Sequence, residues 1–270
     1  MVLTVGALRG ALGFLSRVPV GRDDADWEAF RRTPAALPAV AYALGALITL
    51  PVAAATLLPV RVPSLTAGVA FAAWLYLVTG ITHLDGVADL GDAAVVHGDA
   101  DRRREVLKDS ALGVGGAAAL ALTVFGLATA GTVAVDLARL SLVDAVGLVV
   151  AAEVGAKGAV GALVCVGDAP HEGLGSALTE ESGPRALVGV ALATVPALLL
   201  GWPALRPGVG AFGSTVYPAA TLAAALAVAG VAYAWANARL GGVSGDILGA
   251  TNEVARVVGL HAGVVAWTLS

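Results

Sequence analysis

The chain has 270 residues and a formal net charge of −4; 58% of its residues are hydrophobic and only 13% are charged. A mean hydropathy of +0.85 excludes an ordinary soluble domain. We therefore expect membrane lipid around the chain and no nucleic-acid partner. The single cysteine, Cys165, excludes an intramolecular disulfide and any cysteine-based zinc site.

The N-terminal segment is apolar but interrupted by Arg9 and Arg17, and no clear cleavage site follows it. We predict an N-terminal amphipathic helix at the membrane interface. Beyond it, several apolar stretches reach the ~20 residues that cross a bilayer as a helix. The last stretch is short and contains Arg256 and His261, so we expect six or seven spans. The predicted spans lie near residues 36–58, 64–83, 112–134, 141–165, 186–204, 216–236 and 253–269.

These segments are rich in small residues, which suit close helix packing in lipid, and they lack the polar faces of soluble helices. The predicted fold class is all-α: a polytopic transmembrane helical bundle forming a single domain over residues 1–270. Arginine and lysine gather before the first span and in the even-numbered connections, for example at Arg102, Arg103 and Arg104. The positive-inside rule then places those parts in the cytoplasm and predicts a multi-pass protein of the cell membrane.

Three carboxylates follow the second predicted span. Asp85, Asp89 and Asp92 have an i, i+4, i+7 spacing, so they share one face if the segment is helical. Like charges on one face require a cation among them, and hard oxygen ligands suit Mg²⁺ together with a substrate phosphate. The alternative is a solvated acidic helix end neutralised by nearby arginines. The charge count places this cluster on the cytoplasmic side.

A second acidic segment, residues 237–253, is predicted on the same side. Asp246 follows the glycines Gly241, Gly242 and Gly245 and precedes a helical stretch, where backbone amides favour an anion. Glu253 shares its face if the helix is continuous. Asp246 is therefore a candidate to complete the metal site, and the alternative is a glycine-rich turn with Asp246 as a helix cap.

Two further segments carry candidate substrate-binding residues. Lys108, Asp109 and Ser110 precede a glycine-rich helix entry, where Ser110 can cap the helix and backbone amides can meet a phosphate. Glu153 and Lys157 lie inside the fourth predicted span at i, i+4. Either they pair with each other, or Lys157 offers its charge to a substrate phosphate.

The order and spacing of four short motifs resemble the cobalamin synthases, also called adenosylcobinamide-GDP ribazoletransferases. The similarity covers most of the chain. Its motifs are residues 14–20, 83–92 (beginning His83-Leu-Asp85-Gly), 108–113 and 241–250.

The resemblance implies a membrane transferase that requires Mg²⁺. Such an enzyme joins adenosylcobinamide-GDP to α-ribazole or its 5′-phosphate and releases GMP, as a ribose hydroxyl attacks the phosphorus next to cobinamide. It implies that Asp85, Asp89, Asp92 and Asp246 form the metal and catalytic group and that His83 contributes to substrate binding. It also allows contact with other cobamide-assembly enzymes and a homo-oligomer.

The chain departs from the family pattern at Ala93, Ala111 and Lys157, where Gly, Arg and Arg are common. Since lysine binds phosphate as a point charge, these changes weaken claims about nucleotide contacts. Two alternative functions remain. A phosphatidyltransferase acting on CDP-activated lipid also uses aspartates at helical spacing, although its Asp-x-x-Asp-Gly pattern is not reproduced here. A transporter would bind cargo at Glu153 and Lys157 near the membrane midplane.

Overall fold

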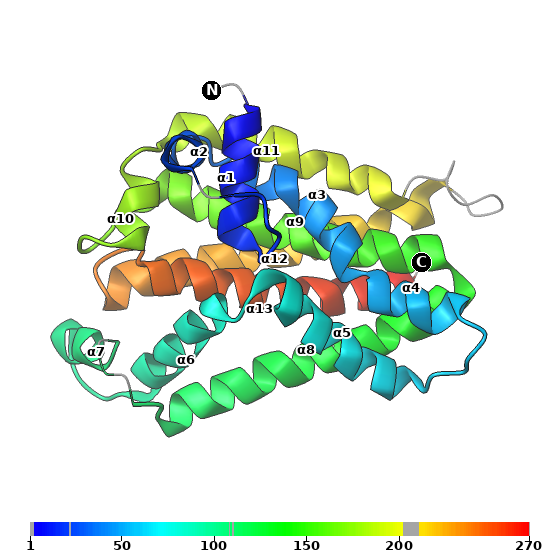
Figure 1. Ribbon diagram of the computed structural model, residues 1–270. Coiled ribbons are helices and arrows are strands. Elements are labelled where there is room, and N and C mark those ends of the chain that lie inside the picture. The colour runs from blue at the N-terminus through cyan, green and yellow to red at the C-terminus, as the bar shows by residue number, and fades with distance from the viewer. Residues whose placement is uncertain (1–2, 22, 108, 110, 202–210, 270) are drawn as a thin grey trace.

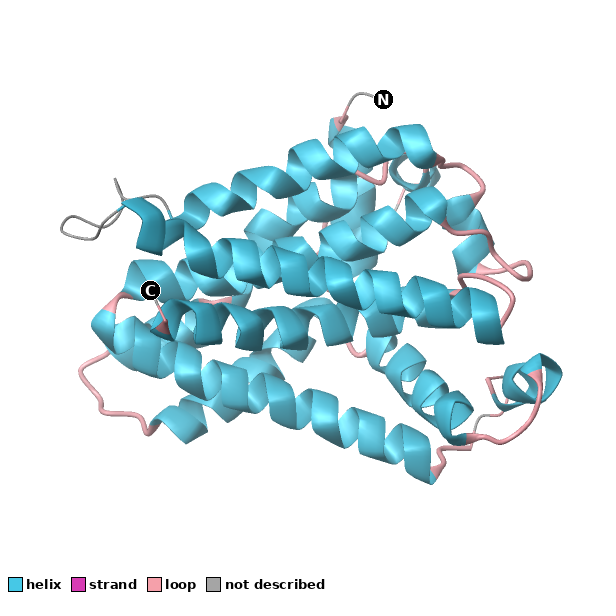
Figure 2. Cartoon of the chain, turned by 180° about the vertical axis from the view of Figure 1, so that it is seen from behind, coloured by secondary structure: helices cyan, strands magenta, loops and turns pink. Residues whose placement is uncertain are grey.

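The computed structural model describes all residues except 1–2, 22, 108, 110, 202–210 and 270, and the side chains of 211–214 are also left out. Helices, with no strand, make up the described part (Figures 1 and 2). In chain order they are α1 (Val5–Leu15), α2 (Asp24–Arg31), α3 (Ala36–Ile48), α4 (Leu50–Leu57), α5 (Ser64–Thr79), α6 (Thr82–Val95), α7 (Ala100–Val106), α8 (Val114–Leu140), α9 (Leu142–Val166), α10 (Leu174–Thr179), the 3₁₀ turn η1 (Pro184–Ala186), α11 (Leu187–Thr194), the 3₁₀ turn η2 (Val195–Gly201), α12 (Ala211–Arg239) and α13 (Gly245–Thr268).

Helix α9 is the centre of the bundle. Of its most apolar 18-residue window, 89% is buried, against 22–39% for the other candidate spans. It packs against α3, α12 and α13, and large apolar side chains on the outer helices, such as Leu122, Phe125 and Val231, are exposed. An apolar outer surface around a buried helix is what lipid surroundings require. The predicted all-α membrane bundle is confirmed.

The spans differ from the prediction in two places. Five helical segments are long and apolar enough to cross a membrane, and α5 with α6 makes a sixth if that bent pair is one span. The predicted seventh span, 253–269, does not qualify: it is part of α13, whose inner face buries Glu253 and Arg256. By length and composition the described residues therefore support five or six spans, below the upper count of seven.

The predicted second span is also divided. Its helix α5 ends at Thr79, and the chain turns by 106° before α6 begins at Thr82. Gly80 makes this break with a φ of +81°, a conformation that glycine adopts without strain. The segment after the predicted second span thus begins with a helix, and that helix carries the aspartates.

Two groups of loops mark the two ends of the bundle. In Figure 1, α7, α10 and the beginning of α13 lie together at one end, and the α4–α5 and α8–α9 connections lie at the other. Helix α1 stands across the long helices in the same view and packs against α2. The N-terminal helix was predicted as an interfacial element; the structure places it beside the end that carries the aspartates.

Candidate functional site

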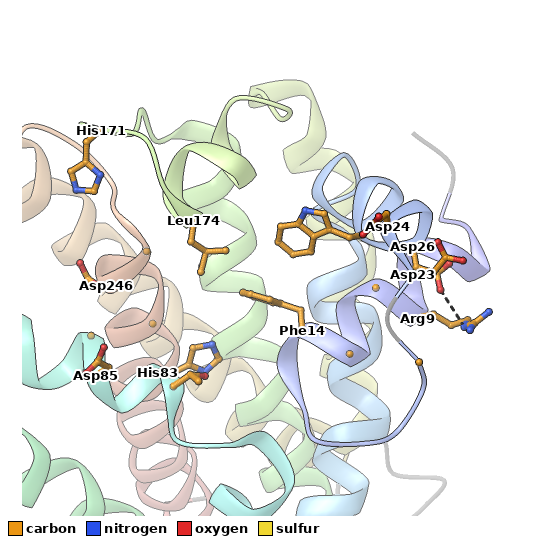
Figure 3. A pocket seen from close by; sticks show the side chains of 18 residues that line it. Arg9, Phe14, Asp23, Asp24, Asp26, His83, Asp85, His171, Leu174 and Asp246 are labelled. Atoms are coloured by element: carbon orange, nitrogen blue, oxygen red, sulfur yellow. Dashed lines mark ion pairs between the residues drawn. The ribbon is translucent and has the colours of Figure 1, made fainter.

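Helix α6 presents its aspartates to the start of α13. The two helices touch backbone to backbone at Gly86: a Cβ there would lie 2.5 Å from the carbonyl oxygen of Asp246. One turn further along α13, a Cβ on Gly249 would lie 3.4 Å from Cα of His83. Glycines therefore let the helices approach closely enough to bring Asp246 beside Asp85, as Figure 3 shows.

This close crossing gives a direct prediction. Gly86→Ala places a methyl group against the backbone of α13, which cannot move aside as a flexible side chain would. We expect a loss of stability of about 1–3 kcal/mol and a loss of activity of at least about tenfold, because the aspartates separate. The matched control is Gly230→Ala in α12, where a Cβ would meet nothing within 4 Å. If Gly86→Ala and Gly230→Ala have the same unfolding curves and the same reaction rates, the close contact between α6 and α13 is contradicted.

The aspartates at this crossing lack a positive partner. The charged neighbours of Asp89 are Asp85, Asp246 and Asp92. No ion pair found among the described residues includes any of these four carboxylates. Like charges that gather without compensation favour the binding of a cation.

The donor set fits a hard divalent cation. Within the described part of the chain, no three acidic, histidine or cysteine side chains already lie in metal-binding geometry. Mg²⁺ does not require such a cage, because it usually takes one or two carboxylates together with water and substrate phosphates. Asp85 and Asp246 come from different helices and can supply carboxylates from two sides, while Asp89 lies one turn along α6.

Asp92 also joins α6 to a neighbouring helix. Its two carboxylate oxygens accept hydrogen bonds of 2.8 Å from the backbone N–H groups of Gly113 and Gly116. These amides belong to the N-terminus of α8, where an acceptor with negative charge is favourable. Helix α8 begins at Val114 with Gly113 at its N-cap position, and the predicted cap residue Ser110 lies outside the described residues. These two bonds fasten α6 to α8, and the role of Asp92 as a metal ligand stays a prediction.

A cavity of about 680 Å³ opens beside Asp85 and Asp246 (Figure 3). The crossing of α6 and α13 forms one wall, which includes His83 and Gly245. The opposite wall comes from α1, α2 and the segment between them, and His171 contributes from the loop before α10. The α1–α2 wall could not be found from sequence, since the apolar pattern of residues 2–20 indicated only a helix at the membrane surface.

Other predicted site residues lie outside this cavity. Gly241 and Gly242 form the turn before α13 with φ values of +85° and +153°. A Cβ on Gly242 would lie 2.3 Å from the carbonyl oxygen of Asp168, so this turn fixes where α13 begins. Asp109 is exposed and accepts a hydrogen bond of 3.0 Å from the N–H of Ala111. Lys108 and Ser110 lie outside the described residues.

Lys157 is buried in a network of charged side chains behind the cavity. Its ammonium group pairs with Glu153, one turn earlier in α9. Glu153 also accepts a hydrogen bond of 2.7 Å from Nε of Arg256, which in turn donates one of 2.7 Å to Glu253. The structure thus shows the ion pair that the i, i+4 spacing allowed, and it brings in Arg256, whose spacing of 103 residues from Glu153 gave no signal.

The network reaches the cavity through His83. The side-chain amide nitrogen of Asn252 lies 3.0 Å from Nδ1 of His83 and donates a hydrogen bond of 2.9 Å to Glu253. The same ring nitrogen lies 3.6 Å from Oε1 of Glu253, so Asn252 and Glu253 together hold this side of His83. His83 is therefore held from behind, with its other ring atoms toward the cavity that it lines.

Comparison with known proteins agrees with this site. The sequence profile of the cobalamin-5-phosphate synthase family matches residues 7–264. A protein of Halorubrum lacusprofundi named adenosylcobinamide-GDP ribazoletransferase is 56% identical over 273 residues, which cover 99% of each chain. Proteins of the same name from Haloquadratum walsbyi and Methanococcoides burtonii are 47% and 30% identical, covering 99% and 97% of this chain and 100% and 93% of their own. No solved structure matches.

The family match spans both walls of the cavity. It begins within α1 and ends within α13, so the aspartates of α6 and Asp246 lie inside it, as does the aromatic segment of α1 and α2. The chain belongs to the cobalamin-5-phosphate synthase family.

Proposed function

We infer that this protein catalyses the adenosylcobinamide-GDP ribazoletransferase reaction, joining adenosylcobinamide-GDP to α-ribazole or its 5′-phosphate with release of GMP. The observation that carries the inference is the family match over residues 7–264, with relatives of that name aligned along almost the whole chain. The uncompensated aspartates beside a cavity of about 680 Å³ support it, because a diphosphate substrate needs a cation and room.

The proposed chemistry is a displacement at phosphorus. The ribose hydroxyl forms a bond to the phosphorus attached to cobinamide, the bond from that phosphorus to the bridging oxygen breaks, and GMP leaves with the electron pair. Mg²⁺, held by Asp85, Asp246 and Asp89, would offset the negative charge of the diphosphate. Asp85 lines the cavity and can accept the proton of the hydroxyl at a carboxylate oxygen.

We propose that the cavity faces the cytoplasm. The cavity end of the bundle carries Arg102, Arg103 and Arg104 on α7 and Arg239 at the end of α12. The opposite end has Arg61 in the α4–α5 connection and Arg139 at the end of α8. Arg206 lies outside the described residues. An excess of arginine on one side indicates the cytoplasmic side of the membrane.

The two alternatives have less support. A transporter would use intramembrane charges to bind cargo, but Glu153, Lys157, Glu253 and Arg256 bond to one another. A phosphatidyltransferase would act on CDP-activated lipid, and no relative with that name is among the matches described above. Both alternatives can be distinguished from the proposed reaction by the nucleotide that is released.

The test uses purified full-length protein in detergent or lipid. We expect GMP release only when adenosylcobinamide-GDP, α-ribazole 5′-phosphate and Mg²⁺ are all present, and its loss on chelation by EDTA with recovery on adding Mg²⁺. The Halorubrum lacusprofundi relative serves as a parallel sample. If this protein releases no GMP where that relative does, the assignment fails. Release of CMP from CDP-diacylglycerol would favour the lipid enzyme instead.

A further inference from the structure

The pair of helices α1 and α2 forms one wall of the cavity. The two helices touch at Gly10, where a Cβ would lie 2.2 Å from the carbonyl oxygen of Asp26. Arg9 joins them at the surface through an ion pair of 3.4 Å with the same aspartate. Because this contact is made by backbone, whatever α1 and α2 present to the cavity is held in a fixed position.

The side chains that α1 and α2 present to the cavity include two aromatic rings. Phe14 and Trp27 both line the cavity, and their ring centroids lie 5.7 Å apart. Buried Phe30 supports both rings at 5.4 and 5.6 Å. In Figure 3, Phe14 projects into the space between α1 and His83. Aromatic faces held in a cavity whose far side carries aspartates suit a ligand with a planar base at one end and phosphate at the other.

One carboxylate beside these rings is free. Asp24 makes no hydrogen bond or ion pair with any described residue, whereas Asp23 caps α2 through the N–H of Ala25. Asp24 lies three residues before Trp27 on α2, so the two share a face of the helix, and both line the cavity. A carboxylate offers two adjacent acceptors, which match the adjacent N1–H and N2–H donors of guanine.

We propose that Phe14 and Trp27 stack on the guanine base of the nucleotide substrate and that Asp24 binds its N1–H and N2–H edge. The proposal rests on the proposed function, since that reaction brings a guanosine diphosphate group to this cavity. The diphosphate then lies toward Asp85 and Asp246, away from the negative charge of Asp24. A benzimidazole base has no comparable pair of donors, so the carboxylate selects guanine over the lower-ligand base.

The first test measures binding of GDP to the full-length protein in lipid nanodiscs with Mg²⁺. Trp27→Ala is expected to weaken GDP binding about tenfold or more, because a stacked base loses its aromatic partner, and Trp27→Phe is expected to retain most of the affinity. The matched control is Trp235→Ala in α12, outside this cavity, which should leave GDP binding unchanged. Unchanged GDP binding by Trp27→Ala and Phe14→Ala would overturn the proposal.

The second test measures the ratios of the affinities for GDP, IDP and XDP. These ratios do not depend on the fraction of the variant that is folded. The native protein should prefer GDP to IDP, which lacks the N2 amine, and to XDP, which has a carbonyl at that position. Asp24→Asn should reverse the order of GDP and XDP, since its amide can donate to that carbonyl while accepting from N1–H. Glu28→Gln removes the same charge from the same helix, where Glu28 pairs with Arg31 and Arg32, and should change nothing.

Two outcomes separate this subsite from the proposed reaction. If the aromatic variants weaken binding of α-ribazole and leave GDP unaffected, the wall holds the lower-ligand base and the guanine assignment is wrong, although GMP release by the native protein still supports the reaction. If the native protein releases GMP but Asp24→Asn keeps the native order of GDP over XDP, Asp24 does not read the base. Only absence of GMP release by the native protein contradicts the reaction itself.

Discussion

Replacing Asp85, Asp89 or Asp246 by asparagine is expected to lower the rate of GMP release by roughly 10²- to 10⁴-fold. Asparagine keeps the size of the side chain but removes the negative charge that the crossing of α6 and α13 concentrates in one place. If these carboxylates hold Mg²⁺, the Mg²⁺ concentration needed for half-maximal rate should also rise. Initial rates over a series of Mg²⁺ concentrations measure both effects.

Two other aspartates serve as controls. Asp101→Asn removes a charge from exposed α7, where Asp101 pairs with Arg104, and should leave the rate nearly unchanged. Asp92→Asn removes the acceptor charge at the start of α8 and is expected to lower stability by about 1 kcal/mol, with a smaller loss of rate than at the crossing. Native rates and native Mg²⁺ dependence in all three crossing variants would place the reaction elsewhere.

The pattern of charge and hydropathy was enough to predict the membrane bundle and the face that Asp85 and Asp89 share. Both depend on local periodicity, which a single sequence contains. The 106° break at Gly80 was missed because the apolar run continues through it. A lone glycine inside a hydrophobic stretch does not distinguish a turn from a close helix contact.

The remaining parts of the site depend on contacts between distant segments. Gly86 and Gly249 each meet the backbone of the other helix, and the sequence does not indicate which segment lies opposite a glycine. The aromatic wall at Phe14 and Trp27 becomes part of the cavity only because α1 and α2 fold back beside α6 and α13. Such packing follows shape complementarity across the whole bundle, and no short spacing in the sequence encodes it.

Contacts between distant segments also form the buried network of Glu153, Lys157, Glu253 and Arg256. Substitutions in this network are expected to lower stability strongly. These four side chains are 1–2% exposed, and their formal charges sum to zero, with two carboxylates and two cations. Glu153→Gln alone leaves one positive charge uncompensated, and Lys157→Met alone leaves one negative charge. Each single change is expected to cost about 3–5 kcal/mol of unfolding free energy, because an unpaired charge stays buried.

The double variant Glu153→Gln/Lys157→Met restores a net charge of zero, because the pair between Glu253 and Arg256 remains. It should therefore be more stable than the sum of the single losses predicts, by an interaction energy of about 1–3 kcal/mol in a double-mutant cycle. Unfolding by denaturant in detergent measures it. Arg139→Met, which removes half of an exposed pair with Asp136, should cost at most about 1 kcal/mol.

Strict additivity of the two single losses would mean that each charge is compensated independently, for example by water. Coupling has a consequence for the site, because the same network holds His83 through Asn252 and Glu253. Glu153 lies on α9, Arg256 on α13 and His83 on α6, so neutralising one member loosens three helices at once. The single variants should therefore lose activity as well as stability, and the double variant should regain part of both.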